Sequence, residues 1–423
     1  MKKLITNIKQ LIGIENEERL KLTGKDMGKV SIIENAFIEI RDGIIHDFGP
    51  MSSLQPQDVA DVSEIISAQD RLIMPTFADS HTHLVFAGPR QGEYRDRLHG
   101  LTYQEIAARG GGILNSVKAL RKMSEEQLLR DALSRLEEVI HYGTGAIEIK
   151  SGYGLSVEAE MKILRVIQKL KYYSPIPIRA TFLGAHAYPT EFASDHKGYI
   201  DLLVNEMIPK VASEGLAEFI DIFCEDGYFS VDDTERVLKA GLEHKLIPKV
   251  HVNQFTSFGG LQKSLEYEAL SVDHLEVMTS EDIDSLKNSY AMPTALPACS
   301  FFIGIPYTPG RQMIDQGLGI ALATDYNPGS SPTGNMQFVQ SLACLQMKLT
   351  PEEALNASTL NSAYAMGMSD EIGSITKGKR ANLIMTKPIP DLAYMTYNFG
   401  ANDVDRVFVD GNEITSIDKP LRL

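Results

Sequence analysis

The sequence predicts an α/β fold, a (β/α)8 barrel of the TIM type with a small β-sandwich domain formed from both chain termini. Two observations lead to this prediction. Eight short apolar runs alternate with amphipathic helical segments in the middle of the chain, whereas both ends carry short strands joined by tight turns. The predicted small domain comprises 1–70 plus 375–423, and the predicted catalytic barrel comprises 71–374.

The barrel strands are predicted from apolar runs that end in or beside a polar residue. These runs are Leu72–Asp79, Ala146–Ile149, Ile178–Leu183, Phe219–Phe223, Val250–Val252, Leu270–Val272, Ala291–Leu296 and Ile320–Thr324. Helix-start signals lie between several runs: 124–127 reads Ser-Glu-Glu-Gln, a capping-box pattern, and 350–353 reads Thr-Pro-Glu-Glu, with proline at the first helical position. Alternating strands and helices give a parallel sheet, and eight repeats favour closure. An open doubly wound sheet is the alternative, but no GxGxxG follows the first run.

The two chain ends resemble each other in pattern. An Asp42-Gly43 turn separates the apolar runs Ala36–Ile40 and Ile44-Ile45, which is typical of a hairpin. Near the other end, Val407–Val409 is followed by a second Asp-Gly pair at 410–411. Two strand-rich ends around a different middle indicate one small β domain assembled from both termini.

Composition excludes several classes of function. Acidic residues outnumber basic ones by 56 to 41, for a formal net charge of −15, so we expect neither a nucleic-acid partner nor an anionic membrane surface. The three cysteines, Cys224, Cys299 and Cys344, form no CxxC pair, which argues against a disulfide framework or a cysteine metal site. Neither a signal peptide nor an apolar run of about 18 residues is evident, so we expect a cytoplasmic protein.

Half of the ten histidines fall at or just past the carboxyl end of a predicted strand. They are His81, His83, His186, His251 and His274. In a barrel the carboxyl ends of all strands form one ring around the mouth, so residues distant in sequence meet there. This clustering predicts a functional site at that end of the barrel.

The sequence His81-Thr82-His83 predicts a metal site. Residues i and i+2 of an extended strand share a face, so both imidazoles can bind one ion. An HxH pattern also occurs by chance, but His251 and Asp325 at other strand ends complete a set of three imidazoles and one carboxylate. Such donors suit zinc or a similar divalent ion, including iron and nickel.

Asp325 follows the apolar run Ile320–Thr324, and a carboxylate there needs a cation or hydrogen-bond donors near it. We therefore expect Asp325 to contact the metal and to accept a proton from water. The alternative is a helix cap or a turn, since 327–330 reads Asn-Pro-Gly-Ser.

Several motifs carry a family resemblance. The segment Pro75–His83 resembles the opening motif of the amidohydrolase superfamily, and Gly373–Leu383 resembles the return into its small domain. Four further motifs resemble the imidazolonepropionase family of histidine breakdown and span most of the barrel. They are Phe86–Arg90, Glu148–Leu155, Thr181–His186 and Asp325–Ser330.

This resemblance implies roles for individual residues. One divalent ion, Zn²⁺ or iron (Fe²⁺ or Fe³⁺), would be held by His81, His83, His251 and Asp325. Asp325 and His274 would be catalytic, with His274 holding the attacked carbonyl or assisting proton transfer. The substrate pocket would be lined by Arg90, Tyr153, His186, Gln254, Asn327, Gly329 and Ser330. Arg90 would pair with a carboxylate in bidentate fashion.

Two positions depart from related barrels. Gln254 stands where related deaminases, and some members of this family, carry Glu; an amide can hydrogen-bond a ring but cannot be a general base. The fourth strand and its end, 219–225, lack the carboxylated lysine with which two-metal barrels bridge their ions, so we favour one metal. Lys150 ends the second strand instead, where it reaches the substrate or forms an ion pair.

The resemblance implies hydrolysis of the cyclic amide of 4-imidazolone-5-propionate to N-formimino-L-glutamate by a homodimer. A bound divalent ion lowers the pKa of its water to about 7, which provides a nucleophile for a poorly reactive lactam. The alternatives are a nucleobase deaminase or another cyclic amidohydrolase on the same barrel, and a non-catalytic scaffold that has lost its metal.

Overall fold

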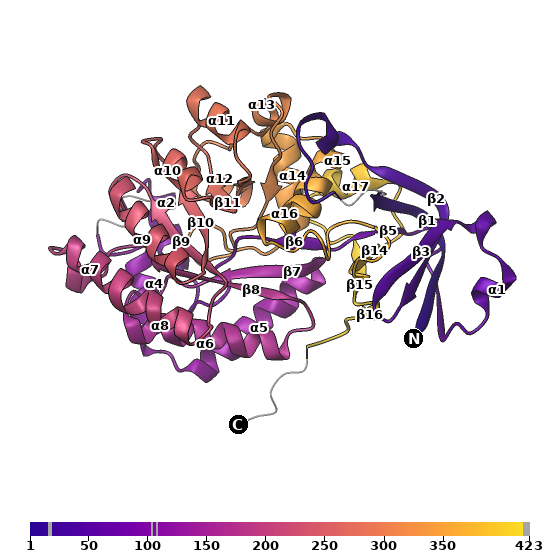
Figure 1. Cartoon of the computed structure of the whole chain (residues 1–423), viewed down its shortest axis with the longest axis horizontal. Helices are drawn as coiled ribbons and strands as arrows, with labels where there is room; N and C mark the ends of the chain where they lie inside the picture. The colour runs from indigo at the N-terminus through magenta and orange to yellow at the C-terminus, as the bar shows by residue number, and fades with distance from the viewer. Residues whose placement is uncertain (16–18, 103–104, 107–108, 418–423) are drawn as a thin grey trace.

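A computed structural model describes residues 1–15, 19–102, 105–106 and 109–417 of the chain. A large barrel surrounded by helices occupies one side of the molecule, and a smaller sheet that contains the N-terminus occupies the other (Figure 1). The predicted fold class is confirmed: a parallel barrel sheet and a separate sheet built from both termini.

The barrel sheet contains eight parallel strands among the described residues, in the spatial order β13 to β6. They are β6 (Phe77–Asp79), β7 (Thr144–Lys150), β8 (Ile178–Ala185), β9 (Phe219–Cys224), β10 (Ile247–Val252), β11 (Ser271–His274), β12 (Met292–Ala295) and β13 (Ala321–Leu322). Each strand pairs with the next strand in the sequence, which is the order a βα repeat produces.

The segments that follow the first and last strands close the barrel. The Asp325 N–H donates to the His81 carbonyl at 3.0 Å, and the His83 N–H donates to the Tyr326 carbonyl at 3.0 Å. Thr82 and Tyr326 form an isolated parallel bridge between them. This closure lays the HxH segment directly beside Asp325, although more than 240 residues separate them in the sequence.

The terminal strands form a mixed sheet in the order β16-β15-β14-β5-β1-β2-β3, with β4 paired to β1. They are β1 (Lys2–Ile14), β2 (Ser31–Arg41), β3 (Ile44–Pro50), β4 (Glu64–Ser67), β5 (Leu72–Pro75), β14 (Leu383–Thr386), β15 (Val404–Val409) and β16 (Asn412–Glu413). Both predicted Asp-Gly turns are present: the φ angles are +49° and +85° at 42 and 43, and +49° and +67° at 410 and 411. Such angles match a type I′ hairpin turn. The domain boundaries stay a prediction.

One predicted strand is wrong. The run Leu72–Asp79 is split, since β5 pairs with β1 and β14 in the terminal sheet, whereas only β6 enters the barrel. Thr76 lies between them, and its N–H donates to Asn382 of the terminal sheet. The whole run is buried, so its apolar pattern is continuous across the change of partner.

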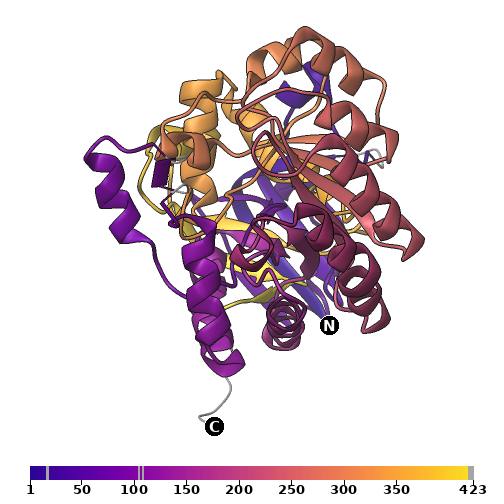
Figure 2. The same cartoon turned by 90° about the vertical axis from the view of Figure 1, so that its left-hand side faces the viewer.

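Helices cover the outside of the barrel (Figure 2). They are α2 (Gln91–Leu98), α4 (Ile113–Lys122), α5 (Glu125–His141), α6 (Val157–Tyr173), α7 (His196–Leu202), α8 (Ile208–Ser213), α9 (Val231–Glu243), α10 (Gly260–Glu266), α11 (Ser280–Lys287), α12 (Pro297–Ile303), α13 (Gly310–Asp315), α14 (Met336–Met347), α15 (Pro351–Ser358) and α16 (Leu360–Ala365). The short helices α1 (Pro56–Val59) and α17 (Leu392–Tyr397) lie in the terminal segments. Both predicted helix starts are confirmed, because the side chains of Ser124 and Thr350 accept from the backbone of the third helical residue.

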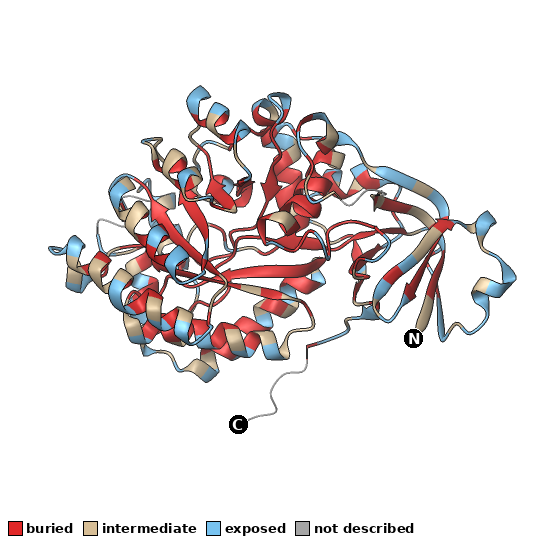
Figure 3. Ribbon diagram, in the orientation of Figure 1, coloured by how far each residue is buried: buried red, intermediate tan, exposed pale blue. Residues whose placement is uncertain are grey.

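The hydrophobic core is divided between the barrel and the terminal sheet. The barrel strands are largely buried on both faces, and most of the surrounding helices bury their inner sides and expose their outer ones (Figure 3). Helix α2 differs, since it has no buried residue. A separate apolar cluster that includes Ile5, Ile38, Ile73 and Leu383 fills the terminal sheet. Among the described residues, no helix is both long and apolar enough to cross a membrane.

Candidate active site and metal centre

The candidate site lies at the carboxyl ends of the barrel strands, where the sequence predicts it. A small cavity of about 30 Å³ opens there. Nine residues predicted for the site line it, together with Ile113 and Phe223: His83, Tyr153, His186, His251, Gln254, His274, Asp325, Asn327 and Ser330. His81 is fully buried and contributes a ring edge to the same cluster.

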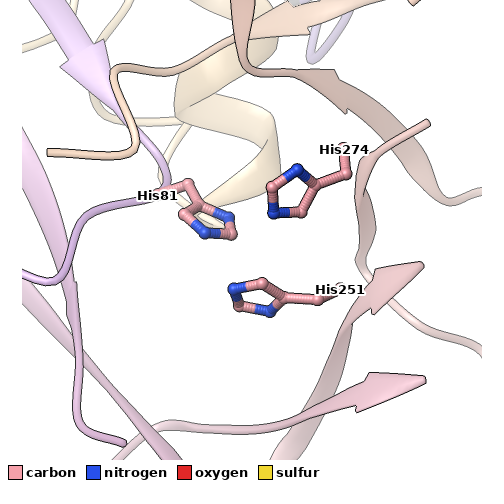
Figure 4. A group of neighbouring side chains, drawn as sticks. All are labelled: His81, His251 and His274. Carbon is pink, nitrogen blue, oxygen red and sulfur yellow. The ribbon is translucent and has the colours of Figure 1, made fainter. Parts of the chain in front are cut away.

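The predicted ligand side chains converge. His81 Nε2 and His83 Nε2 lie 3.6 and 3.7 Å from Asp325 Oδ1. The rings of His81 and His251 are 4.4 Å apart, and Figure 4 shows His81, His251 and His274 arranged around a common space. Donor atoms that bind one ion at about 2.0–2.2 Å lie roughly 3–4 Å from one another, so the 3.6 and 3.7 Å distances to Asp325 fit a shared ion.

One buried atom shows that a cation suits this arrangement. His81 Nε2 is shielded from solvent and has no hydrogen-bond partner among the described residues. An unpaired polar atom in such surroundings is costly unless a ligand satisfies it. The donor atoms of His81, His83 and Asp325 lie within 4.8 Å of one another, as do those of His81, His251 and His274. The residues present therefore fit a metal ion.

Carboxylates behind two of these histidines orient their rings. His81 Nδ1 lies 2.7 Å from Asp273 Oδ2, and His251 Nδ1 lies 2.9 Å from Asp221 Oδ2. An acceptor at Nδ1 keeps the proton on that nitrogen and directs the Nε2 lone pair into the cluster. Asp273 is hydrogen-bonded to His81 Nδ1 and thus favours the tautomer of His81 that a metal requires, whereas Asp221 lies close to His251 Nδ1 without a hydrogen bond to it.

A buried lysine connects those two aspartates. Lys150 Nζ lies 2.8 Å from Asp221 Oδ2, 3.5 Å from Asp273 Oδ2 and 2.7 Å from Glu148 Oε1. Burial opposes the charge of Lys150, but the three carboxylates outweigh it and raise the pKa of the ammonium. Of the two roles left open by the sequence, the structure shows the ion pair. It is part of a network beneath the cluster, to which Lys249 adds a second cation 2.6 Å from Glu148 Oε2.

Burial sets the protonation of the histidines. It holds the pKa values of His81, His83 and His251 well below 6.5, and Lys150 and the neighbouring imidazoles lower them further. Burial also lowers the pKa of His186 to about 4. These rings are neutral at pH 7, and an imidazole must be neutral to bind a metal ion.

His274 differs from the other histidines. Burial lowers its pKa, but Glu276 Oε1, 3.3 Å from His274 Nδ1, and the carboxylates of Asp325 and Asp273 raise it above its usual value. Burial raises the pKa of Asp325 to about 6, against the opposing effect of His274. Both residues adopt left-handed backbone conformations, with φ +87° and +53°. Strain at such positions is a feature of functional sites.

Asn327 organises the loop after Asp325. Its Nδ2 donates to the Asp325 carbonyl at 2.6 Å and to Ser330 Oγ at 2.8 Å, while its Oδ1 accepts from the N–H groups of Gly329 and Ser330. Ser330 Oγ in turn donates to Asp325 Oδ2 at 3.2 Å. The loop therefore fixes the position of the Asp325 carboxylate.

Arg90 and Gly329 line a second cavity of about 240 Å³ rather than the small one. The Arg90 guanidinium packs against the Gly329 backbone so closely that a Cβ at position 329 would overlap it. Arg90 stands in the wall next to the histidine cluster, and its charge contributes to the low pKa of His186.

Sequence reasoning missed the residues that support the site. Asp221 and Asp273 were passed over, although an acid inside an apolar strand requires a buried partner and could have been noticed for that reason. Ile113 and Phe223 carry no comparable signal, because only the fold brings them to the cavity, and Glu276 is identified only by its contact with His274.

Comparison with known proteins decides the family. A model described as the amidohydrolase family matches residues 186–414. The imidazolonepropionase of Christiangramia forsetii is 54% identical over 411 residues, which are 97% of this chain and 99% of that protein. The imidazolonepropionase of Flavobacterium psychrophilum is 54% identical over 414 residues, 98% and 100% of the two chains. The chain belongs to the imidazolonepropionase family.

More distantly related proteins share this fold. The crystal structure of an adenosine deaminase from Xanthomonas campestris with bound zinc has a TM-score of 0.70 at 17% identity, covering 97% of this chain and 92% of that one. This likeness shows a common fold.

Proposed function

We propose that this chain hydrolyses the cyclic amide of 4-imidazolone-5-propionate, giving N-formimino-L-glutamate. This makes it a hydrolase that acts on carbon–nitrogen bonds in cyclic amides. The observation that carries the proposal is the buried cluster of neutral imidazoles and one carboxylate at the barrel mouth, in a chain 54% identical to imidazolonepropionases over nearly its full length.

His81, His83, His251 and Asp325 are proposed to hold one divalent ion, zinc or iron. When bound, the ion supplies Lewis-acid chemistry that activates water and polarises the amide carbonyl. The protein contributes the arrangement of the ligands: Asp273 fixes the tautomer of His81, Asp221 lies beside the ring of His251, and the loop of Asn327 fixes Asp325.

Asp325 and His274 are proposed to move protons. Asp325, with its pKa raised to about 6, is ionised at pH 7 yet basic enough to take a proton from the attacking water and return it to the leaving ring nitrogen. His274, whose pKa the neighbouring Glu276 raises, would donate a hydrogen bond to the oxygen on which negative charge develops. Glu276 therefore acts through His274.

The remaining predicted residues are proposed to bind the substrate. Arg90 carries a permanent positive charge at the wall of the site and suits the propionate arm. Tyr153, His186 and Gln254 line the small cavity beside the proposed metal ligands and would contact the planar ring. Gln254 Nε2 donates to Cys299 Sγ at 3.5 Å, and the other polar atoms of its amide would hydrogen-bond the ring.

The alternative is a metal-dependent deaminase on the same barrel. Gln254 argues against it, because an amide cannot deliver the proton that ring deamination requires from this position. The testing experiment incubates purified, metal-replete protein with 4-imidazolone-5-propionate and follows both products. We expect N-formimino-L-glutamate by mass spectrometry and no ammonia. Metal-replete protein that leaves this compound unchanged but releases ammonia from an aminated base would overturn the proposal.

The homodimer, the cytoplasmic location and the exclusion of nucleic-acid and membrane partners stay predictions. A scaffold without catalysis is disfavoured by the complete donor set, since a protein that has lost its metal has no selection for an unpaired buried imidazole.

A further inference from the structure

Glu93 makes contacts that no role assigned so far explains. It lies in the first turn of α2, three residues after Arg90, and its side chain is only 13% exposed. Its carboxylate Oε2 accepts from Arg90 Nε at 2.8 Å and lies 2.7 Å from Arg90 Nη2. One oxygen therefore engages one complete edge of the guanidinium.

The other carboxylate oxygen of Glu93 reaches a different element. Oε1 accepts from the Gly112 N–H at 3.1 Å and from Asn115 Nδ2 at 3.2 Å. Gly112 is the N-cap of α4, and the next residue, Ile113, lines the small cavity beside the histidines. Glu93 thus connects the arginine of the site to the start of the helix that forms part of the cavity wall.

The face of the Arg90 guanidinium is restricted as well as its edge. The guanidinium packs on the Gly329 backbone, in the loop that Asn327 holds beside Asp325. An arginine side chain has several freely rotating bonds, and fixing it on binding costs entropy that a preformed contact avoids. With Glu93 on one edge and Gly329 against its plane, Arg90 is held in one orientation before any ligand arrives.

We propose that Glu93 is a positioning residue that determines the specificity of this site for a carboxylated substrate, by orienting Arg90 toward the carboxylate arm. The inference rests on the proposed function for the identity of that arm. Glu93 does not touch the reacting ring and acts only through Arg90. Loss of its charge should therefore weaken the binding of the arm and leave the chemistry at the ring intact.

The test compares two probes on metal-replete protein by calorimetry: imidazole-4-propionate, which has the carboxylate, and 4-ethylimidazole, which lacks it. In the wild-type protein the first should bind more tightly. In Glu93→Gln we expect the ratio of the two affinities to fall about tenfold, with KM for 4-imidazolone-5-propionate raised about tenfold and kcat within twofold. Asp96→Asn is the matched control, since Asp96 is an exposed acid on the same helix, and it should leave the ratio unchanged.

A merely structural role predicts another pattern. If Glu93 only anchored α2 to α4, Glu93→Gln would weaken the binding of both probes equally. An unchanged ratio of the two affinities therefore overturns the inference. Glu93→Asp keeps the charge but withdraws it by one methylene; it should lower the ratio about threefold and provides a second measurement if the amide variant does not fold. Failure of the wild-type protein to hydrolyse the substrate would instead refute the proposed function, whatever the ratio.

Discussion

Replacing Asp273 by Asn tests how the metal centre is held. Asp273 Oδ2 lies 2.7 Å from His81 Nδ1 and 3.5 Å from Lys150 Nζ, and both groups are fully buried. Its Oδ1 accepts from Ser271 Oγ at 2.6 Å. The variant removes one negative charge beneath the proposed ion and weakens the preference for the Nδ1–H tautomer of His81. Both effects lower metal affinity.

The expected loss of metal affinity follows from the effect of similar carboxylate partners of metal-bound imidazoles. Loss of such a carboxylate typically costs 10- to 100-fold in affinity, or about 1.4–2.7 kcal/mol. The assay titrates metal-free protein with Zn²⁺ against a chromogenic chelator, with thermal unfolding of the metal-free form as the control for folding. An affinity within twofold of the wild-type value in a folded variant would refute the idea that Asp273 supports the ion through His81.

Three further predictions concern the site itself. His251→Ala should lose both bound metal and activity, and full metal occupancy measured by elemental analysis would remove this residue from the ligand set. Arg90→Ala should raise KM at least tenfold with unchanged metal content, because a bidentate charged contact is lost; an unchanged KM would exclude the carboxylate contact. Glu276→Gln should lower the pKa of His274, since Glu276 raises it. The His274 imidazolium then loses its proton at lower pH, so the alkaline limb of the pH–kcat profile should move to lower pH. A profile that does not move would contradict the proposed role of protonated His274.

The sequence predicts the barrel well because its strands carry local signals. Each strand is a short apolar run, and in a barrel the sequential order of strands is also their spatial order. The split of 72–79 between two sheets has no such signal. A residue buried in either sheet is apolar, so the change of partner after Pro75 depends on tertiary pairing with Asn382 and its neighbours.

Local signals also predict part of the candidate site, whereas tertiary contacts determine the rest. Histidines and Asp325 at strand ends were identifiable because periodicity and topology place them at one rim. The side chains that orient them were not, since Asp273, Asp221 and Lys150 meet inside the barrel across three different strands. The pairing of Arg90 with Glu93 is local, at a spacing of three residues on a helix, but its link to Gly112 requires the folded loop.

The metal dependence of ring opening tests the central claim most directly. Protein freed of metal by a chelator is titrated with Zn²⁺ or Fe²⁺, and hydrolysis of 4-imidazolone-5-propionate is measured against the amount of ion bound. We predict no activity in the metal-free protein and a linear recovery that saturates at one ion per chain. Full activity of the metal-free protein, or saturation only at two ions per chain, would contradict a single ion held by His81, His83, His251 and Asp325.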